Sequence, residues 1–112
     1  MESGTLTIAE QVDDMVTWYF ITVDPRAVSP LAKVLISTGR NVDGYATEAV
    51  LVRLSEIGDP AWAEELTFDS EAEACTVRCT RKAPLVHLVR RFEKRLAEPA
   101  RLRRLVKSLA ED

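Results

Sequence analysis

The 112-residue sequence lacks long hydrophobic runs and any secretory leader pattern. Its longest uninterrupted apolar stretches, such as residues 49–52, hold about four residues, whereas a membrane span needs roughly 18 or more. The first residues, Met1 to Gly4, show neither the basic patch nor the apolar segment of a signal peptide. We therefore expect a cytoplasmic protein with no membrane contact.

The residues from which metal, redox and nucleotide sites are built are also scarce. The chain has two cysteines, one histidine and four glycines, and the glycines are scattered singly, so no phosphate-binding loop is predicted. Cys75 and Cys79 have no nearby ligand partners to complete a zinc site, and on an extended strand they stand about 13 Å apart, too far for a disulfide. We expect both to be buried on one strand face.

His87 is the single histidine, and no nucleophile motif or partner carboxylate accompanies it. We interpret it as a partly exposed side chain on a helix. Together these shortages lead us to expect that the protein is not an enzyme and holds no cofactor and no metal.

What the chain does have is the balance of an ordinary globular protein. Hydrophobic residues make up 46% of the sequence and charged residues 29%, well away from the composition of disordered chains. A chain of this length divided in two would leave each half short of core. Residues 1–112 are therefore predicted to form a single domain.

Periodicity and turn residues predict an α+β fold with about four strands and about four helices in the order ββααββαα. The sheet is expected to be antiparallel, with helices on one face. Ser29 is expected to cap the first helix, and Asp69 to Ala72 to form the turn of the second hairpin. The predicted strands are residues 5–9, residues 15–23, a third strand that begins at 66, and residues 74–80. The predicted helices are residues 30–38, a second helix that ends at 58, a short helical turn after 60, residues 84–97 and residues 99–109. In the second helix, apolar residues recur at helical spacing at Val50, Leu51, Leu54 and Ile57.

Acidic and basic residues are separated along the chain. Residues 1–77 hold 14 acidic and 4 basic residues, and residues 78–112 hold 4 acidic and 11 basic ones, so that a net charge of about −10 faces one of about +7. The basic side chains alternate with apolar positions, as on any amphipathic helix. We favour a solvated basic face, or one paired with the acidic part, over nucleic-acid binding.

Carboxylates gather at Glu64 and Glu65 and again between Asp69 and Glu73. Neither group shows the alternation and central glycine of an EF-hand, and no second acidic motif completes a two-metal site. We interpret the cluster as a solvated turn, with a binding surface as its functional alternative.

Two short segments carry a resemblance to a known family. The first runs from Gly44-Tyr45 to Glu48, and the second is Phe68-Asp69-Ser70-Glu71-Ala72. In these segments, and in the order of elements over residues 40–108, the chain resembles the immunity protein 51 family of bacterial polymorphic-toxin systems. Thr47 stands where that family's pattern has tryptophan, and Ser70 where it has proline.

The resemblance implies a protein that binds a cognate toxin in the cytoplasm and covers its active surface, a task for a rigid surface of complementary charge. An acidic surface would suit a nuclease toxin, whose own cleft is basic. On the basis of this resemblance, the residues expected to bind the partner are Tyr45, Glu48, Trp62, Asp69, Glu71 and Glu73. Packing against the core is the favoured alternative for the two aromatic residues, and a hydrogen bond to its own backbone is the alternative for Asp69.

Two further readings stay open. The first is a nucleic-acid-binding or regulatory module that uses basic residues of the last two helices, namely Arg90, Arg91, Lys94, Arg101, Arg103 and Arg104. The second is a self-associating domain, a homodimer for example, in which Trp18, Tyr19 and Phe20 mark an exposed sheet face. Three consecutive aromatic residues on a strand cannot all point to one side.

Overall fold

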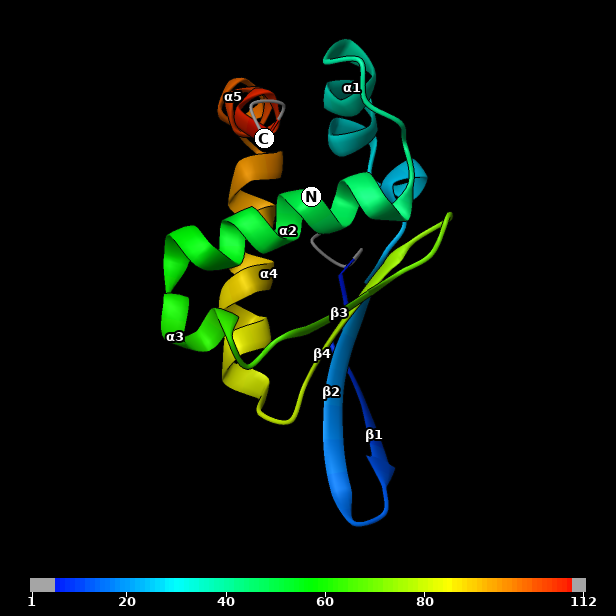
Figure 1. Ribbon diagram of the computed structural model, residues 1–112, viewed down its shortest axis with the longest axis vertical. Coiled ribbons are helices and arrows are strands. Elements are labelled where there is room, and N and C mark those ends of the chain that lie inside the picture. Colours follow the sequence, from blue (N-terminus) through cyan, green and yellow to red (C-terminus); the bar gives the residue numbers. More distant parts are fainter. Residues whose placement is uncertain (1–5, 110–112) are drawn as a thin grey trace.

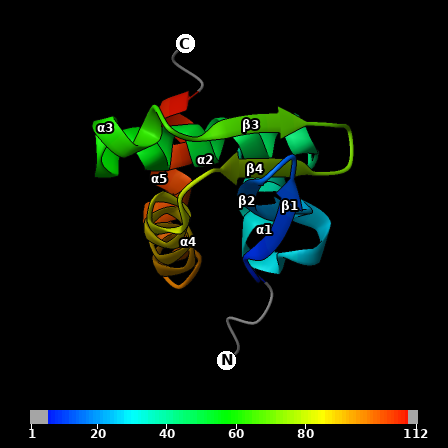
Figure 2. The same cartoon turned by 90° about the horizontal axis from the view of Figure 1, so that it is seen from below.

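Four antiparallel strands form one sheet in the computed structural model, which describes residues 6–109 (Figure 1). The strands are β1 (Ala9–Asp13), β2 (Val16–Val23), β3 (Thr67–Ser70) and β4 (Cys75–Cys79). Their order across the sheet is β1-β2-β4-β3, which Figure 2 shows from below. The two hairpins, which are distant in sequence, therefore join through β2 and β4.

The helices gather on one side of this sheet. They are the 3-10 helix η2 (Pro25–Ala27) and the helices α1 (Ser29–Ser37), α2 (Gly44–Gly58), α3 (Pro60–Ala63), α4 (Lys82–Leu96) and α5 (Pro99–Leu109). Helices α2 and α4 pack directly on the strands, and α1 packs against α5 farther from the hairpin tip (Figure 1). The predicted α+β class and its order of elements are confirmed, including the short helical turn after residue 60, which is α3. The 3-10 helix η2 is an addition to the prediction.

The core lies between the sheet and the helices. Alternation along β2 and β4 turns one set of side chains inward, and each of these is at most 1% exposed: Ile21, Val23, Cys75, Val77 and Cys79. The helices contribute stripes at helical spacing, with Leu51, Leu54, Leu85, Phe92, Leu102 and Val106 among the buried residues. The prediction that both cysteines are buried on one strand face is confirmed.

The first strand of the first hairpin lies later in the sequence than predicted, whereas the second strand lies where it was expected. The expected strand at 5–9 is wrong, because β1 begins only at Ala9; Thr5 lies outside the described residues. The reason is the turn: Asp14 and Met15, with φ of 50° and 69°, form a two-residue connection, which fixes β1 as the stretch paired with the start of β2. Strong β-formers were therefore a poor guide to this strand.

Helix α1 begins differently from the prediction but ends as expected. Ser29 lies inside the helix, and Val28 occupies the capping position without a side-chain hydrogen bond, so the predicted serine cap is wrong. At the other end Gly39 has a φ of +79°. The amide of Arg40 donates to the carbonyl of Leu35 at 2.8 Å and that of Gly39 to Ile36 at 3.1 Å, the paired bonds of a Schellman motif.

One more detail of the prediction is wrong. Asp69 and Ser70 belong to β3, so the turn of the second hairpin starts at Glu71, whose amide donates to the carbonyl of Ala74 at 2.8 Å. Helix α2 ends at Gly58 as expected, and of the four apolar residues at helical spacing Val50, Leu51 and Leu54 are buried, whereas Ile57 is 49% exposed. Across residues 6–109, the structure contains no helix with both the length and the apolar character of a membrane span.

Candidate protein-binding surface

The start of α2 packs tightly against the turn between β3 and β4. Asp43 caps the helix, since its side chain accepts a hydrogen bond from the amide of Ala46 at 2.8 Å. The amide of Gly44 donates to the carbonyl of Ala72 at 3.1 Å. A Cβ atom at Gly44 would overlap the carbonyl oxygens of Glu71 and Ala74, so glycine permits this close approach.

A second contact joins the same two segments. The hydroxyl of Ser70 on β3 donates a hydrogen bond to the carboxylate of Glu48 on α2. Thr47, the other position that departs from the family pattern, is fully buried, and its hydroxyl donates to the carbonyl of Asp43 at 2.9 Å. The two segments that carry the resemblance are thus held against each other, although 22 residues separate Glu48 from Ser70.

Five of the six predicted site residues lie around this junction, which we call the acidic corner: Tyr45, Glu48, Asp69, Glu71 and Glu73. Asp69, Glu71 and Glu73 are exposed, and within the described part of the chain none of them forms an ion pair or a side-chain hydrogen bond. The suggested bond from Asp69 to its own backbone is therefore not made. The corner presents carboxylates that nothing in residues 6–109 neutralises.

Tyr45 is 61% exposed, so the favoured alternative that it caps the core is wrong. It stands at one end of an open groove of about 520 Å³ along the outer side of α2, which also includes Glu48, Arg53 and Glu56. Tyrosine is one of the residues enriched at the energetically important positions of protein interfaces.

Trp62 lies apart from the acidic corner, on α3 at the opposite end of α2 (Figure 1). Its ring meets that of His87 edge to face, with centroids 4.3 Å apart, and the guanidinium of Arg81 stands 5.8 Å from its centroid. Arg81 is held in turn by Glu65 through hydrogen bonds of 2.8 and 2.7 Å. Trp62 is half-buried in this local cluster, which separates it from the other five residues.

Cys75, the buried cysteine nearest the acidic corner, is held in the unreactive thiol form. Burial raises the pKa of the Cys75 thiol to about 11, a hydrogen bond with Ser70 opposes that rise, and the charges of Glu48 and Asp69 add to it. A thiol is a nucleophile or a metal ligand only as the thiolate. No group of three potential metal ligands from among His, Cys, Asp and Glu occurs within residues 6–109.

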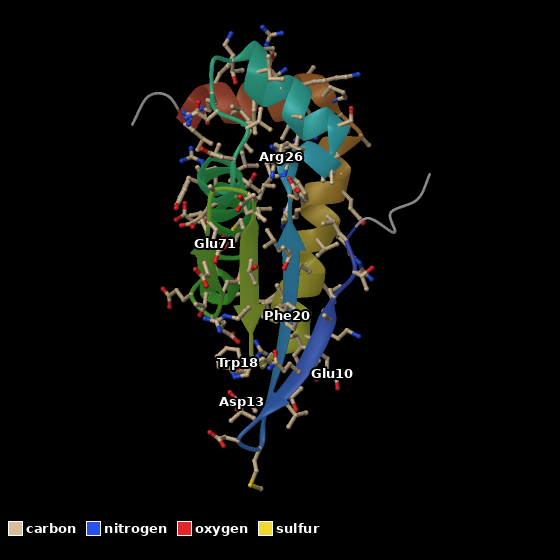
Figure 3. All side chains as sticks on the ribbon, turned by 90° about the vertical axis from the view of Figure 1, so that its right-hand side faces the viewer. Glu10, Asp13, Trp18, Phe20, Arg26 and Glu71 are labelled. Atoms are coloured by element: carbon tan, nitrogen blue, oxygen red, sulfur yellow. The ribbon has the colours of Figure 1, made fainter. Side chains whose placement is uncertain are left out.

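A second surface, of which the six predicted site residues include only Asp69, is the side of the sheet that faces away from the helices (Figure 3). The strand register places Trp18, Phe20 and Thr22 of β2 on it, beside Arg78 and Thr76 of β4. We call this the open sheet face; its further members are Ala9, Gln11, Asp13, Val16, Thr67 and Asp69. The signal was present in the run of three aromatic residues, of which only Tyr19 turns toward the core.

Charge is separated in space as well as in sequence. Three ion pairs occur in the described part of the chain, and only Arg81 with Glu65 connects the acidic part to the basic part. The six basic residues proposed for nucleic-acid binding are all exposed on α4 and α5. Four cations, Arg91, Lys94, Arg95 and Arg101, line a crevice of about 90 Å³ beside Leu54 and Ile57.

Comparisons of the chain with protein-family models, with curated proteins and with solved structures found no match. The resemblance described above therefore rests on the residues quoted for it and on the order of elements around them.

Proposed function

We propose that this chain is a bacterial immunity protein, which binds a cognate toxin domain and covers that domain's active surface. The observation that carries the proposal is the acidic corner, where Asp69, Glu71 and Glu73 are exposed and have no ion partner among residues 6–109. They gather at the turn that packs on the start of α2, which carries the exposed Tyr45. An uncompensated acidic surface attracts a basic one, and such complementarity speeds encounter and selects partners.

The backbone beneath this surface is held before any partner arrives. The Asp43 cap, the Gly44 amide and the Ser70 hydroxyl each tie the start of α2 to its surroundings. A surface that is already ordered loses less conformational entropy on binding, so more of the contact energy appears as affinity. Rigid presentation of charge suits an inhibitor that works by occlusion.

Coexpression tests the proposal directly. The polypeptide encoded beside this chain is produced in a sensitive bacterium with and without the protein, and survival and copurification are measured. We expect survival only with the protein present, together with a copurifying complex. Killing that the protein leaves unchanged would contradict the proposal.

The crevice at Arg91 and Lys94 favours a second candidate function, a nucleic-acid-binding or regulatory module. Its cations would meet phosphates, and such binding weakens steeply as salt rises. The test is a titration of the protein with fluorescently labelled single-stranded and duplex oligonucleotides at 50 and 200 mM salt, a roughly fourfold difference in salt concentration. Measurable binding at low salt with a steep salt slope would support the module, and no binding at low salt would remove it.

A further inference from the structure

We propose that the open sheet face is the docking surface for a basic, nucleic-acid-binding face of the toxin domain, with Trp18 and Phe20 at its centre. This inference rests on the proposed function and adds the contact surface and the chemistry of the partner.

The centre of the face combines aromatic and small polar side chains. Trp18 and Phe20 are both half-buried on the side of β2 away from the helices. The guanidinium of Arg78 lies over the Trp18 ring, 5.5 Å from its centroid, which holds both groups in place. Beside them the hydroxyls of Thr22 and Thr76 meet at 3.2 Å. Tryptophan and arginine dominate the energetics of protein interfaces when they lie at the centre of a patch.

The β1–β2 hairpin extends this face beyond the helices (Figure 1). Two of its apolar side chains are solvated there, since Met15 in the turn is 96% exposed and Val16, which the register places on this face, is 42% exposed. Met15 also adopts a φ of 69°, a conformation that costs a side-chain-bearing residue free energy. An exposed, flexible thioether at a projecting tip is a typical contact residue of protein-binding surfaces.

Charge identifies the occupant. Figure 3 shows Asp13 on the hairpin side of the aromatic centre and Glu71 on the other side. Asp14 lies in the turn after Asp13, and the register places Asp69 on β3 beside Thr76. None of these four forms an ion pair within the part of the chain that the structure describes. Arg78 is the single basic residue that the register places on this face among residues 6–109. The complementary partner is rich in arginine and lysine.

The same charges argue against a second copy of this chain as the occupant. Unpaired acids stand on both sides of the aromatic centre among residues 6–109, and Arg26, at the end that holds Glu71, is already paired with Asp24. Two copies packed face to face would therefore bring acids against acids, which is unfavourable. A domain that binds nucleic acid has the required opposite sign, since its cleft must attract phosphates. Covering that cleft would also exclude its substrate.

The two tryptophans of the chain, Trp18 and Trp62, allow a matched test. The protein is labelled with 5-fluorotryptophan, and the two ¹⁹F resonances are assigned with Trp18→Phe and Trp62→Phe. The probe is the unlabelled toxin domain encoded beside the chain, inactivated by substitution of its catalytic residue. A soluble gadolinium chelate reports which indole stays accessible to solvent.

We expect the Trp18 resonance to shift on complex formation and to become protected from broadening by the chelate. The Trp62 resonance should neither shift nor become protected. A complex seen by size-exclusion chromatography in which Trp18 is unchanged would overturn the docking surface and leave the proposed function standing. Absence of any complex would remove the proposed function and the inference together.

Discussion

Ser70 and Glu48 are joined by a hydrogen bond that ties β3 to the first turns of α2. The contact connects two segments 22 residues apart in the sequence, and it sets the position of the acidic corner relative to the helix. Proline at position 70 could not make this bond, because it has no hydroxyl. In this chain, serine therefore provides a link between helix and hairpin that the family pattern does not suggest.

The first prediction concerns that bond. A hydrogen bond to a charged group contributes more than one between neutral groups, so Ser70→Ala is expected to lower the free energy of unfolding by about 1–2 kcal/mol. A double-mutant cycle with Glu48→Ala, measured by urea unfolding, should give a coupling energy of about 1 kcal/mol. Additive effects of the two substitutions would show that the bond contributes nothing.

The second prediction concerns the close approach at Gly44. In Gly44→Ala the new methyl group would overlap backbone carbonyls that cannot move aside, so we expect a loss of about 2–3 kcal/mol. Gly58→Ala is the matched control in the same helix. There the three nearest atoms that the methyl group would meet all belong to the side chain of Arg91, which can move aside.

Alanine also has a higher helix propensity than glycine, so the free energy of unfolding of Gly58→Ala should be either unchanged or raised by up to about 1 kcal/mol. Thermal unfolding of both variants beside the wild type measures the difference. Equal destabilisation by the two substitutions would mean that Gly44 does not serve a close approach.

Much of the fold could be predicted because its signals are local. The alternation of Cys75, Val77 and Cys79 on β4 and the helical stripe from Leu85 to Phe92 are periodic patterns that burial confirms. Gly39 ended α1 as expected, because glycine adopts the left-handed conformation that a Schellman motif needs. The order of elements followed from these patterns.

The remaining features depend on contacts between distant segments. No periodicity indicates that Ser70 reaches Glu48, or that Trp62 packs on His87 instead of joining the acidic corner. The start of β1 is set by the turn at Asp14 and Met15, since pairing with β2 and not β-propensity selects its residues. The run of three aromatic residues indicated an exposed sheet face, but which of them turn outward follows only from knowing which side of the sheet the helices cover.

The third prediction concerns the hairpin tip. Met15 adopts a φ of 69°, which glycine tolerates without steric cost, so Met15→Gly should raise the free energy of unfolding by about 1 kcal/mol. Gln11→Gly, in the middle of β1, should instead lower it, because glycine weakens a strand interior. Chemical unfolding of the two variants tests the turn, and a destabilised Met15→Gly would contradict the assigned conformation.

The fourth prediction concerns the Cys75 thiol. Burial raises its pKa in the folded protein to about 11, from 9.0 in the absence of the fold. A raised pKa means that the fold favours the neutral thiol, so this contribution to stability is complete below pH 9.0 and is lost as the pH rises toward 11. Cys75→Ala should remove that part of the pH dependence.

Thiol reactivity gives an independent reading of the same site. At pH 8 an aromatic disulfide reagent should leave the folded protein unmodified for many minutes, and should titrate both cysteines once guanidinium unfolds it. Rapid reaction of native Cys75 would show an exposed or activated thiolate and contradict the structure.

The central claim is that the acids of the acidic corner, which have no ion partner among residues 6–109, draw a basic toxin domain onto this protein. Calorimetric titration with the inactivated toxin domain encoded beside the chain tests this claim most directly. Glu71→Lys and Glu64→Lys are matched, since both residues are exposed, neither forms an ion pair among residues 6–109, and only Glu71 belongs to the corner. The account predicts a 1:1 complex with a Kd below about 1 µM for the wild type and for Glu64→Lys, and an affinity at least about tenfold weaker for Glu71→Lys. No binding by the wild type, or equal affinities for the two variants, would contradict it.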